Sequence, residues 1–256
     1  MVMFNGPAEV SGNRVCQELT SRWPEISRPT ELDVKDKIAT FNVGSAMVFL
    51  APMPAPIPWS DLEGPCATSL LWKNATHEVK QHQQHLLVTV HGELEPIAQS
   101  TLLTQVTTAV LASSPTATGV YWGNATLIVP KAIFIDFAME VMNEGPPLHI
   151  WVDFRVGSES DNTSSGFTAG MTALGHMELE AKNSPEAPGD LRERFMGLAG
   201  YLLENGAVIK NGDTIGEDAN ERIRVVYSKS AFGHEGKVMR LEYGQAAKPK
   251  SWWKMW

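Results

Sequence analysis

The segment DLRERFMGLAGYLLENG, residues 190–206, has the clearest helical pattern in the chain. Its apolar residues recur at the spacing of one helix face: Leu191, Phe195, Leu198 and Leu202. Asp190 and Glu193 have the spacing of a capping box at the start of a helix. Asn205-Gly206 supplies the left-handed residue that ends one. These signals predict a helix from about Asp190 to Asn205 with one buried face.

Further elements are predicted on both sides of this helix. Strands are expected at 43–50, 86–90, 119–129 (as one strand or two), 149–156, 167–181, 223–228 and 237–243. A helix is expected at 60–73. Two more helices are expected to begin at Pro96 and at Pro130, because proline fits the first turn of a helix. The strand at 43–50 is expected to be buried, and the polar run 157–166 to be a flexible loop. The order, roughly βαβαβαββαββ, predicts an α/β fold of mixed α+β type: a mixed β-sheet sandwich with helices packed on it.

This pattern divides the chain into three expected parts. Residues 1–39 are predicted to form an N-terminal arm with a short helix at about 15–22. Residues 40–245 are predicted to form a single α/β domain. Residues 246–256 are a tail rich in tryptophan.

The composition limits the classes of function. The 256 residues include 21 basic and 29 acidic side chains, a net charge of −8, and 43% are hydrophobic. Such a chain has enough apolar residues for a core, and its acidity argues against nucleic-acid binding. Prolines interrupt the most apolar stretch, 46–59, so no stable membrane insertion is expected. With no signal peptide recognised, we expect a cytoplasmic protein, while export by a dedicated secretion machine stays open.

The sequence carries no clear catalytic or metal-binding motif. His77 and His82 are five residues apart, so on a helix they would point away from each other, unlike the ligands of a zinc protease. Cys16 and Cys66 allow at most one disulfide and no zinc cage. Glu178 and Glu180 share one face of a strand and are expected to be solvated. No metal and no cofactor is therefore expected.

Two alternative functions, an enzyme and a small-ligand sensor, would depend on residues that are scattered along the chain. An enzyme, such as a hydrolase-like secreted effector, would build its site from four of them: His85, Asp153, Glu204 and Asp213. Asp153 lies in an apolar strand with Arg155 on the same face, and an exposed ion pair is the expected arrangement. Asp213 is also expected to accept backbone hydrogen bonds in a turn where Gly212 or Gly216 has a positive φ. A small-ligand sensor would instead use three tryptophans as a pocket lining: Trp59, Trp72 and Trp122.

The tail places three tryptophans within five residues: Trp252, Trp253 and Trp256. Exposed tryptophan is typical of partner docking. The same side chains can also fold back over the protein's own sheet edge or groove. Both interpretations remain open at this point, with the three tryptophans as candidate partner-binding residues.

Three segments resemble a known family. These are GYLLENGAVIKNGDTIG (200–216), GMTALGHMELE (170–180) and AFGH (231–234). They are similar to the mainly bacterial family called domain of unknown function 4261, over about residues 40–245 and most specifically over 168–243. The signature residues, structural or functional, are Gly200, Tyr201, Glu204, Asn205, Gly206, Asp213 and Gly216. The family carries no assigned activity, so the resemblance transfers no catalytic residue.

Together these observations favour a non-enzymatic interaction protein with a basic protein partner. Genes of the resembled family are sometimes found near bacterial toxin and secretion loci, which is an association and not a mechanism. The resemblance therefore suggests an immunity protein, or an accessory or cargo protein of a type VI-like secretion system. The partner's identity and the oligomeric state do not follow from the sequence.

Overall fold

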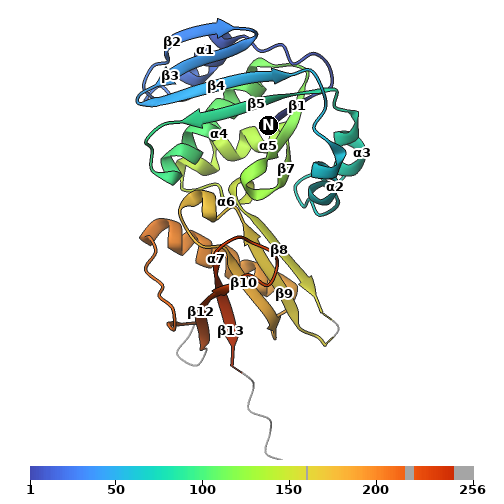
Figure 1. Ribbon diagram of the computed structural model, residues 1–256, viewed down its shortest axis with the longest axis vertical. Coiled ribbons are helices and arrows are strands. Elements are labelled where there is room, and N and C mark those ends of the chain that lie inside the picture. The colour runs from blue at the N-terminus through green and yellow to red at the C-terminus, as the bar shows by residue number, and fades with distance from the viewer. Residues whose placement is uncertain (160, 217–221, 245–256) are drawn as a thin grey trace, which may run out of the picture. The chain divides into compact units, whose positions relative to one another are not determined.

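The computed structural model describes residues 1–159, 161–216 and 222–244, and Figure 1 shows its helices and strands. The chain divides into two units. The first contains residues 1–153 with 172–175, and the second contains 154–171 with the described residues from 176 onward. This division differs from the expected single domain over 40–245, because the boundary falls inside that range. The predicted tail, 246–256, lies outside the described residues.

The first unit contains a seven-stranded sheet in the order β2-β3-β4-β5-β1-β6-β7. Its strands are β1 Val2–Phe4, β2 Thr30–Lys35, β3 Ile38–Val43, β4 Ala46–Met53, β5 Gln84–His91, β6 Ala117–Trp122 and β7 Leu127–Pro130. Neighbouring strands pair antiparallel throughout this order.

Residues 1–39 are part of this sheet, whereas the sequence predicted an arm. β1 lies between β5 and β6, and its three side chains are fully buried. A three-residue strand is too short to show an alternating pattern, so only its pairing partners identify it. The helix expected at 15–22 is present as α1, Gly12–Arg22, which begins after the N-cap Ser11.

Helices cover this sheet on both faces. On one side α4, Pro96–Ser113, contacts β5, α1 and α5, Lys131–Met139. The predicted stripe of α4 is buried as expected, with Leu102, Val106 and Val110 at most 7% exposed. On the other side α2, Trp59–Ala67, and α3, Ala75–Glu78, pack on Met3 of β1 in one apolar cluster. A short 3-10 helix, η1, follows at Val79–Gln81.

The second unit contains a six-stranded mixed sheet in the order β11-β12-β13-β10-β9-β8. Its strands are β8 Asp153–Ser158, β9 Ser164–Ala169, β10 Leu179–Ser184, β11 Thr214–Ile215, β12 Ile223–Lys229 and β13 Lys237–Tyr243. β10 and β13 are parallel, whereas β9–β10, β11–β12 and β12–β13 are antiparallel. The α+β class, with one antiparallel sheet, one mixed sheet and packed helices, is therefore confirmed.

The helix predicted at 190–205 is α7, Pro188–Asn205, which contacts β9. Leu191, Phe195 and Leu202 are buried as predicted. The capping box is not formed, because the helix begins two residues earlier, where Pro188 occupies the first turn after the N-cap Ala187. Gly206, with φ +77°, ends the helix as expected.

Two predicted strands have a different structure. The range 149–156 begins with a short helix, α6 Leu148–Trp151, and only then enters β8, because Pro147 starts a helical turn that Val152 N closes on Leu148 O. The range 167–181 forms β9 and β10, separated by a turn with a 3-10 helix at Thr172–Leu174. The strands also shorten the loop expected at 157–166, since β8 runs to Ser158 and β9 starts at Ser164.

Candidate functional site

The four residues of the enzyme hypothesis are divided between the two units. His85 lies in the first unit on β5, whereas Glu204 and Asp213 are exposed in the second. Asp153 is only 8% exposed at the start of β8, although an exposed ion pair was predicted for it. Its side chain is therefore placed for contacts within the protein.

His85 and His82 both fix the proline-rich segment 52–58. His85 Nδ1 lies 2.7 Å from Ala55 O, and burial lowers the pKa of His85 below its ordinary value of 6.5. His82 Nε2 accepts a hydrogen bond of 2.8 Å from Ile57 N. These contacts give both histidines a structural role in holding the extended segment against β5.

Glu178 is buried in the second unit, whereas a solvated side chain was predicted. Its carboxylate accepts hydrogen bonds from Thr168 Oγ1 at 2.8 Å, Gly170 N at 3.0 Å and Met171 N at 3.2 Å. The donors belong to the end of β9 and the turn after it. Glu178 therefore holds the reversal between β9 and β10.

Glu180 is fully buried two residues further along β10, which also corrects the prediction of a solvated face. Its carboxylate accepts hydrogen bonds from Ser230 Oγ and, at 2.9 Å, from Ala231 N. Arg240 on β13 lies 3.7 Å away and completes a charged pair. Period-two alternation places Glu178 and Glu180 on one face, but the end of β9 and the turn after it cover Glu178, and the turn after β12 covers Glu180.

Ser230 organises this turn. Its Oγ accepts hydrogen bonds from Phe232 N and His234 N, each at 3.0 Å, while donating to Glu180. The proton acceptor of Ser230 is the fully buried Glu180 carboxylate, and His234 contributes only its backbone N–H to Ser230. The geometry fits a folded-loop anchor better than an activated nucleophile.

An aromatic group adjoins this anchor. The Phe167 ring lies 5.0 Å from Phe232 and 5.2 Å from His234 between ring centroids, and the Arg155 guanidinium lies 5.9 Å from the Phe167 centroid. Within the described part of the chain, His234 Nε2 and Arg240 Nε are buried without a hydrogen-bond partner. We call the following set of residues the β10 anchor: Arg155, Phe167, Glu180, Ser230, Phe232 and His234.

The signature residues predicted from the resemblance lie at the end of α7 and in the turns after it. Tyr201 is 49% exposed, and its carbonyl accepts a hydrogen bond from Asn205 Nδ2. Asp213 Oδ2 accepts a hydrogen bond of 2.7 Å from Lys210 N, and Gly212 has φ +95°, as the turn prediction required. The candidate partner-binding residues Trp252, Trp253 and Trp256 lie outside the described residues.

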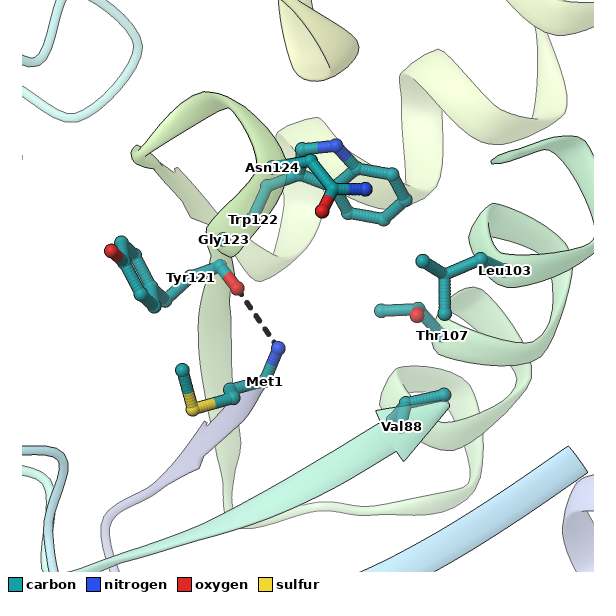
Figure 2. A pocket seen from close by; sticks show the side chains of 8 residues that line it. All are labelled: Met1, Val88, Leu103, Thr107, Tyr121, Trp122, Gly123 and Asn124. Atoms are coloured by element: carbon teal, nitrogen blue, oxygen red, sulfur yellow. Dashed lines mark hydrogen bonds between the residues drawn. The ribbon is translucent and has the colours of Figure 1, made fainter. Parts of the chain in front are cut away.

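The three tryptophans of the sensor hypothesis lie in different surroundings. Trp72 is buried in the cluster beneath α2 and donates from Nε1 to Glu78, while Trp59 packs on the same cluster under the Lys80 ammonium. Only Trp122 of the three lines the cavity drawn in Figure 2. The three rings therefore do not line one pocket together in the described part of the chain.

The cavity in Figure 2 has a volume of about 170 Å³ and lies in the first unit between β5, β6 and α4. Val88, Leu103 and Thr107 form one wall. On the opposite side the N-terminal amino group of Met1 donates a hydrogen bond of 2.9 Å to Tyr121 O. Burial lowers the pKa of this amino group to about 5. The space is small for a ligand, since typical ligand pockets exceed about 300 Å³.

The comparisons with known proteins bear on the second unit. Residues 167–242 match the family model of DUF4261, a domain of unknown function. This match confirms the resemblance predicted from the signature segments. No curated protein and no solved structure matches the chain. The DUF4261 match runs from β9 to β13 and contains the carboxylates of Glu178 and Glu180 together with Ser230 and His234.

Sequence reasoning missed the β10 anchor because its members come from four separate elements. The available signals were two segments quoted for the DUF4261 resemblance: GMTALGHMELE, 170–180, which ends in Glu180, and AFGH, 231–234. Among the described residues, no group of three or more His, Cys, Asp or Glu side chains is arranged to hold a metal ion. None of the described helices is long and apolar enough to cross a membrane.

The charge of the chain is unevenly divided. The first unit contains 8 basic and 15 acidic residues, a net charge of −7, whereas the rest of the sequence contains 13 basic and 14 acidic residues, a net charge of −1. The acidity noted in the whole chain is therefore carried mainly by the first unit, which lies outside the DUF4261 match except for residues 172–175.

Proposed function

We propose that this chain is a non-enzymatic interaction protein whose acidic first unit binds a basic protein partner. The observation that carries the proposal is the net charge of −7 on that unit. Opposite charge steers two proteins into encounter and suppresses wrong partners. The position of the protein beside a toxin or a secretion apparatus, as immunity, accessory or cargo protein, is the finer form of this proposal.

The buried carboxylates support a structural role for the second unit. Glu178 and Glu180 accept hydrogen bonds from donors in β9 and in the turns after β9 and β12. A general acid or base must instead reach a proton of its substrate. In this proposal the DUF4261 region is a rigid scaffold, and recognition belongs to the first unit.

The test is co-purification of the full chain with each protein encoded by an adjacent gene, followed by calorimetry of any complex. We expect one basic partner, with an affinity that falls about tenfold or more as salt rises from low to moderate concentration. Growth arrest by that partner, relieved by co-expression of this chain, would assign the immunity role. A complex with an acidic protein, or one insensitive to salt, would contradict the proposal.

Matched variants locate the charge that matters. Glu25→Gln with Glu63→Gln neutralises two exposed carboxylates of the first unit, while Glu193→Gln with Glu204→Gln neutralises two exposed carboxylates of the second. We expect only the first pair to weaken binding. Equal effects of the two pairs would remove the first unit as the recognition unit.

A further inference from the structure

One half of a sheet face in the first unit is left uncovered by any helix. Along β3, β4 and β5 the side chains alternate between a buried and an open side. The buried side includes Phe41, Val48, Leu50 and Val90, none more than 5% exposed. The open side carries Ile38, Met47 and Met53, which are 40%, 41% and 38% exposed. The prediction of a buried strand at 43–50 is thus correct for only one face of β4.

The strand register makes the open side one continuous surface. Phe49 lies between Thr40 and Thr89, and Met47 lies between Asn42 and His91. Further along, Ala51 is opposite Leu87 and Met53 is opposite His85. Phe49 and Leu87 are half-buried. We name this surface the open face, defined by Ile38, Met47, Phe49, Met53 and Leu87.

The same side of the sheet is covered elsewhere. On β1, Met3 is fully buried beneath the cluster of α2 and α3. The cover ends at His85, whose ring meets Ala55 O, and Figure 1 shows α2 and α3 beside β7 and away from β3 and β4. The open face is therefore where the helical layer stops, and its apolar side chains have no covering element among the described residues.

The chemistry of this surface is apolar at the centre and charged at the rim. β3, β4 and β5 contain no Lys, Arg, Asp or Glu. At the edge, Glu31 Oε2 accepts a hydrogen bond from Asn42 Nδ2 at 2.8 Å. In the strand register Asp33 is opposite Thr40, and Lys35 is opposite Ile38. An apolar centre within a polar rim is the usual anatomy of a protein–protein interface.

We propose that the open face is the docking surface for a protein partner that presents apolar side chains flanked by basic ones. This inference rests on the proposed function and adds the place of contact. Charge complementarity selects the occupant, because the unit that carries the face has a net charge of −7. A second copy of this chain would bring two such charges together and is disfavoured for that reason.

Methyl resonances of the full chain, labelled with ¹³C at methionine, provide the first test. The probe is a synthetic peptide that alternates lysine and leucine, and its counterpart alternates glutamate and leucine. We expect the lysine peptide to shift the Met47 and Met53 signals in a salt-dependent manner, while Met171 and Met239, at most 3% exposed in the second unit, stay in place. Equal shifts with the glutamate peptide, or shifts confined to other methionines, would overturn the proposal.

Variants give the second test. Met47→Lys and, separately, Ile38→Lys replace an exposed apolar side chain of the open face with a positive charge that repels a basic partner, and each is expected to weaken peptide binding about tenfold or more. Leu70→Lys is the matched control, because Leu70 is 66% exposed outside β3, β4 and β5. Equal binding by all three variants would refute the assignment.

The outcome separates this inference from the proposed function. A basic partner that binds wild type and Met47→Lys equally leaves the proposed function standing and removes the open face. If no protein partner binds wild type, the proposed function fails first. A dimer in sedimentation that Met47→Lys dissociates would identify a second copy as the occupant and would also overturn the inference.

Discussion

The hydroxyl of Ser230 donates a hydrogen bond to the Glu180 carboxylate, which is fully buried although the two residues are 50 positions apart in the chain. Ala231 N donates to the same carboxylate, and Ser230 Oγ accepts from two further backbone N–H groups. One buried carboxylate thus organises the turn between β12 and β13 within the DUF4261 region.

Glu180→Gln should destabilise the protein by about 1–3 kcal/mol, because the donors lose a charged acceptor and the new amide places its own N–H groups among them. Arg240 would also lose its partner. Urea unfolding followed by circular dichroism measures the change. Glu193→Gln on the exposed side of α7 is the control, with an expected change below about 0.5 kcal/mol. Equal midpoints for the two variants would show that the anchor contributes nothing to stability.

Two glycines of the second unit should respond to alanine in opposite directions. A Cβ at Gly166 would meet Arg155 O at 2.5 Å and the Phe195 ring at 3.1 Å, so Gly166→Ala should cost about 1–3 kcal/mol. A Cβ at Gly197 meets nothing within 4 Å, and this residue lies inside α7. Gly197→Ala should therefore stabilise by about 0.5–1 kcal/mol. Thermal unfolding of both variants checks the two signs, and a stabilised Gly166→Ala would contradict the packing of α7 on β9.

Stability should fall as the pH drops below the ordinary histidine pKa of 6.5, in part because of His85. Burial lowers the pKa of His85, so below pH 6.5 the unfolded chain binds a proton that the folded chain resists. The His85 contribution is fully present above that pH and is lost on acidification. Urea midpoints between pH 5 and 7.5 should therefore vary less for His85→Gln than for wild type.

His77→Gln, the same substitution at an exposed histidine, is the comparison for that experiment. Burial also lowers the pKa of His176, so His85→Gln removes only part of the slope. A wild-type slope retained in full by His85→Gln would show that this ring is protonated as easily in the folded state as in the unfolded one.

Both cysteines should react slowly with iodoacetamide in the native protein. Cys16 and Cys66 are free thiols, and burial raises the pKa of Cys66 to about 11. At pH 7.5 roughly 3 in 10,000 Cys66 side chains would be thiolate, the reactive form. Mass spectrometry after timed alkylation should find Cys66 unmodified in buffer and modified in urea. Rapid native labelling of Cys66 would place it outside the core cluster that includes Leu62 and Trp72.

The helices were accessible from the sequence because their signal is local. The stripe of Leu191, Phe195 and Leu202 in α7, and that of Leu102, Val106 and Val110 in α4, each lie within a few turns of one element. The order of the predicted elements likewise indicated the mixed α and β class, and the signature segments predicted the DUF4261 resemblance that the family model confirms over 167–242.

Tertiary structure decided what depends on distant residues. β1 is a strand only because β5 and β6 pair with it, and Glu178 and Glu180 are buried only because turns from β9 and β12 bring their donors to β10. Alternation along β4 shows that its side chains take two sides, but it does not show which side a helix covers. Local sequence thus determines the shape of an element, whereas burial, pairing and the open face follow from which elements meet, because those contacts join residues far apart in the chain.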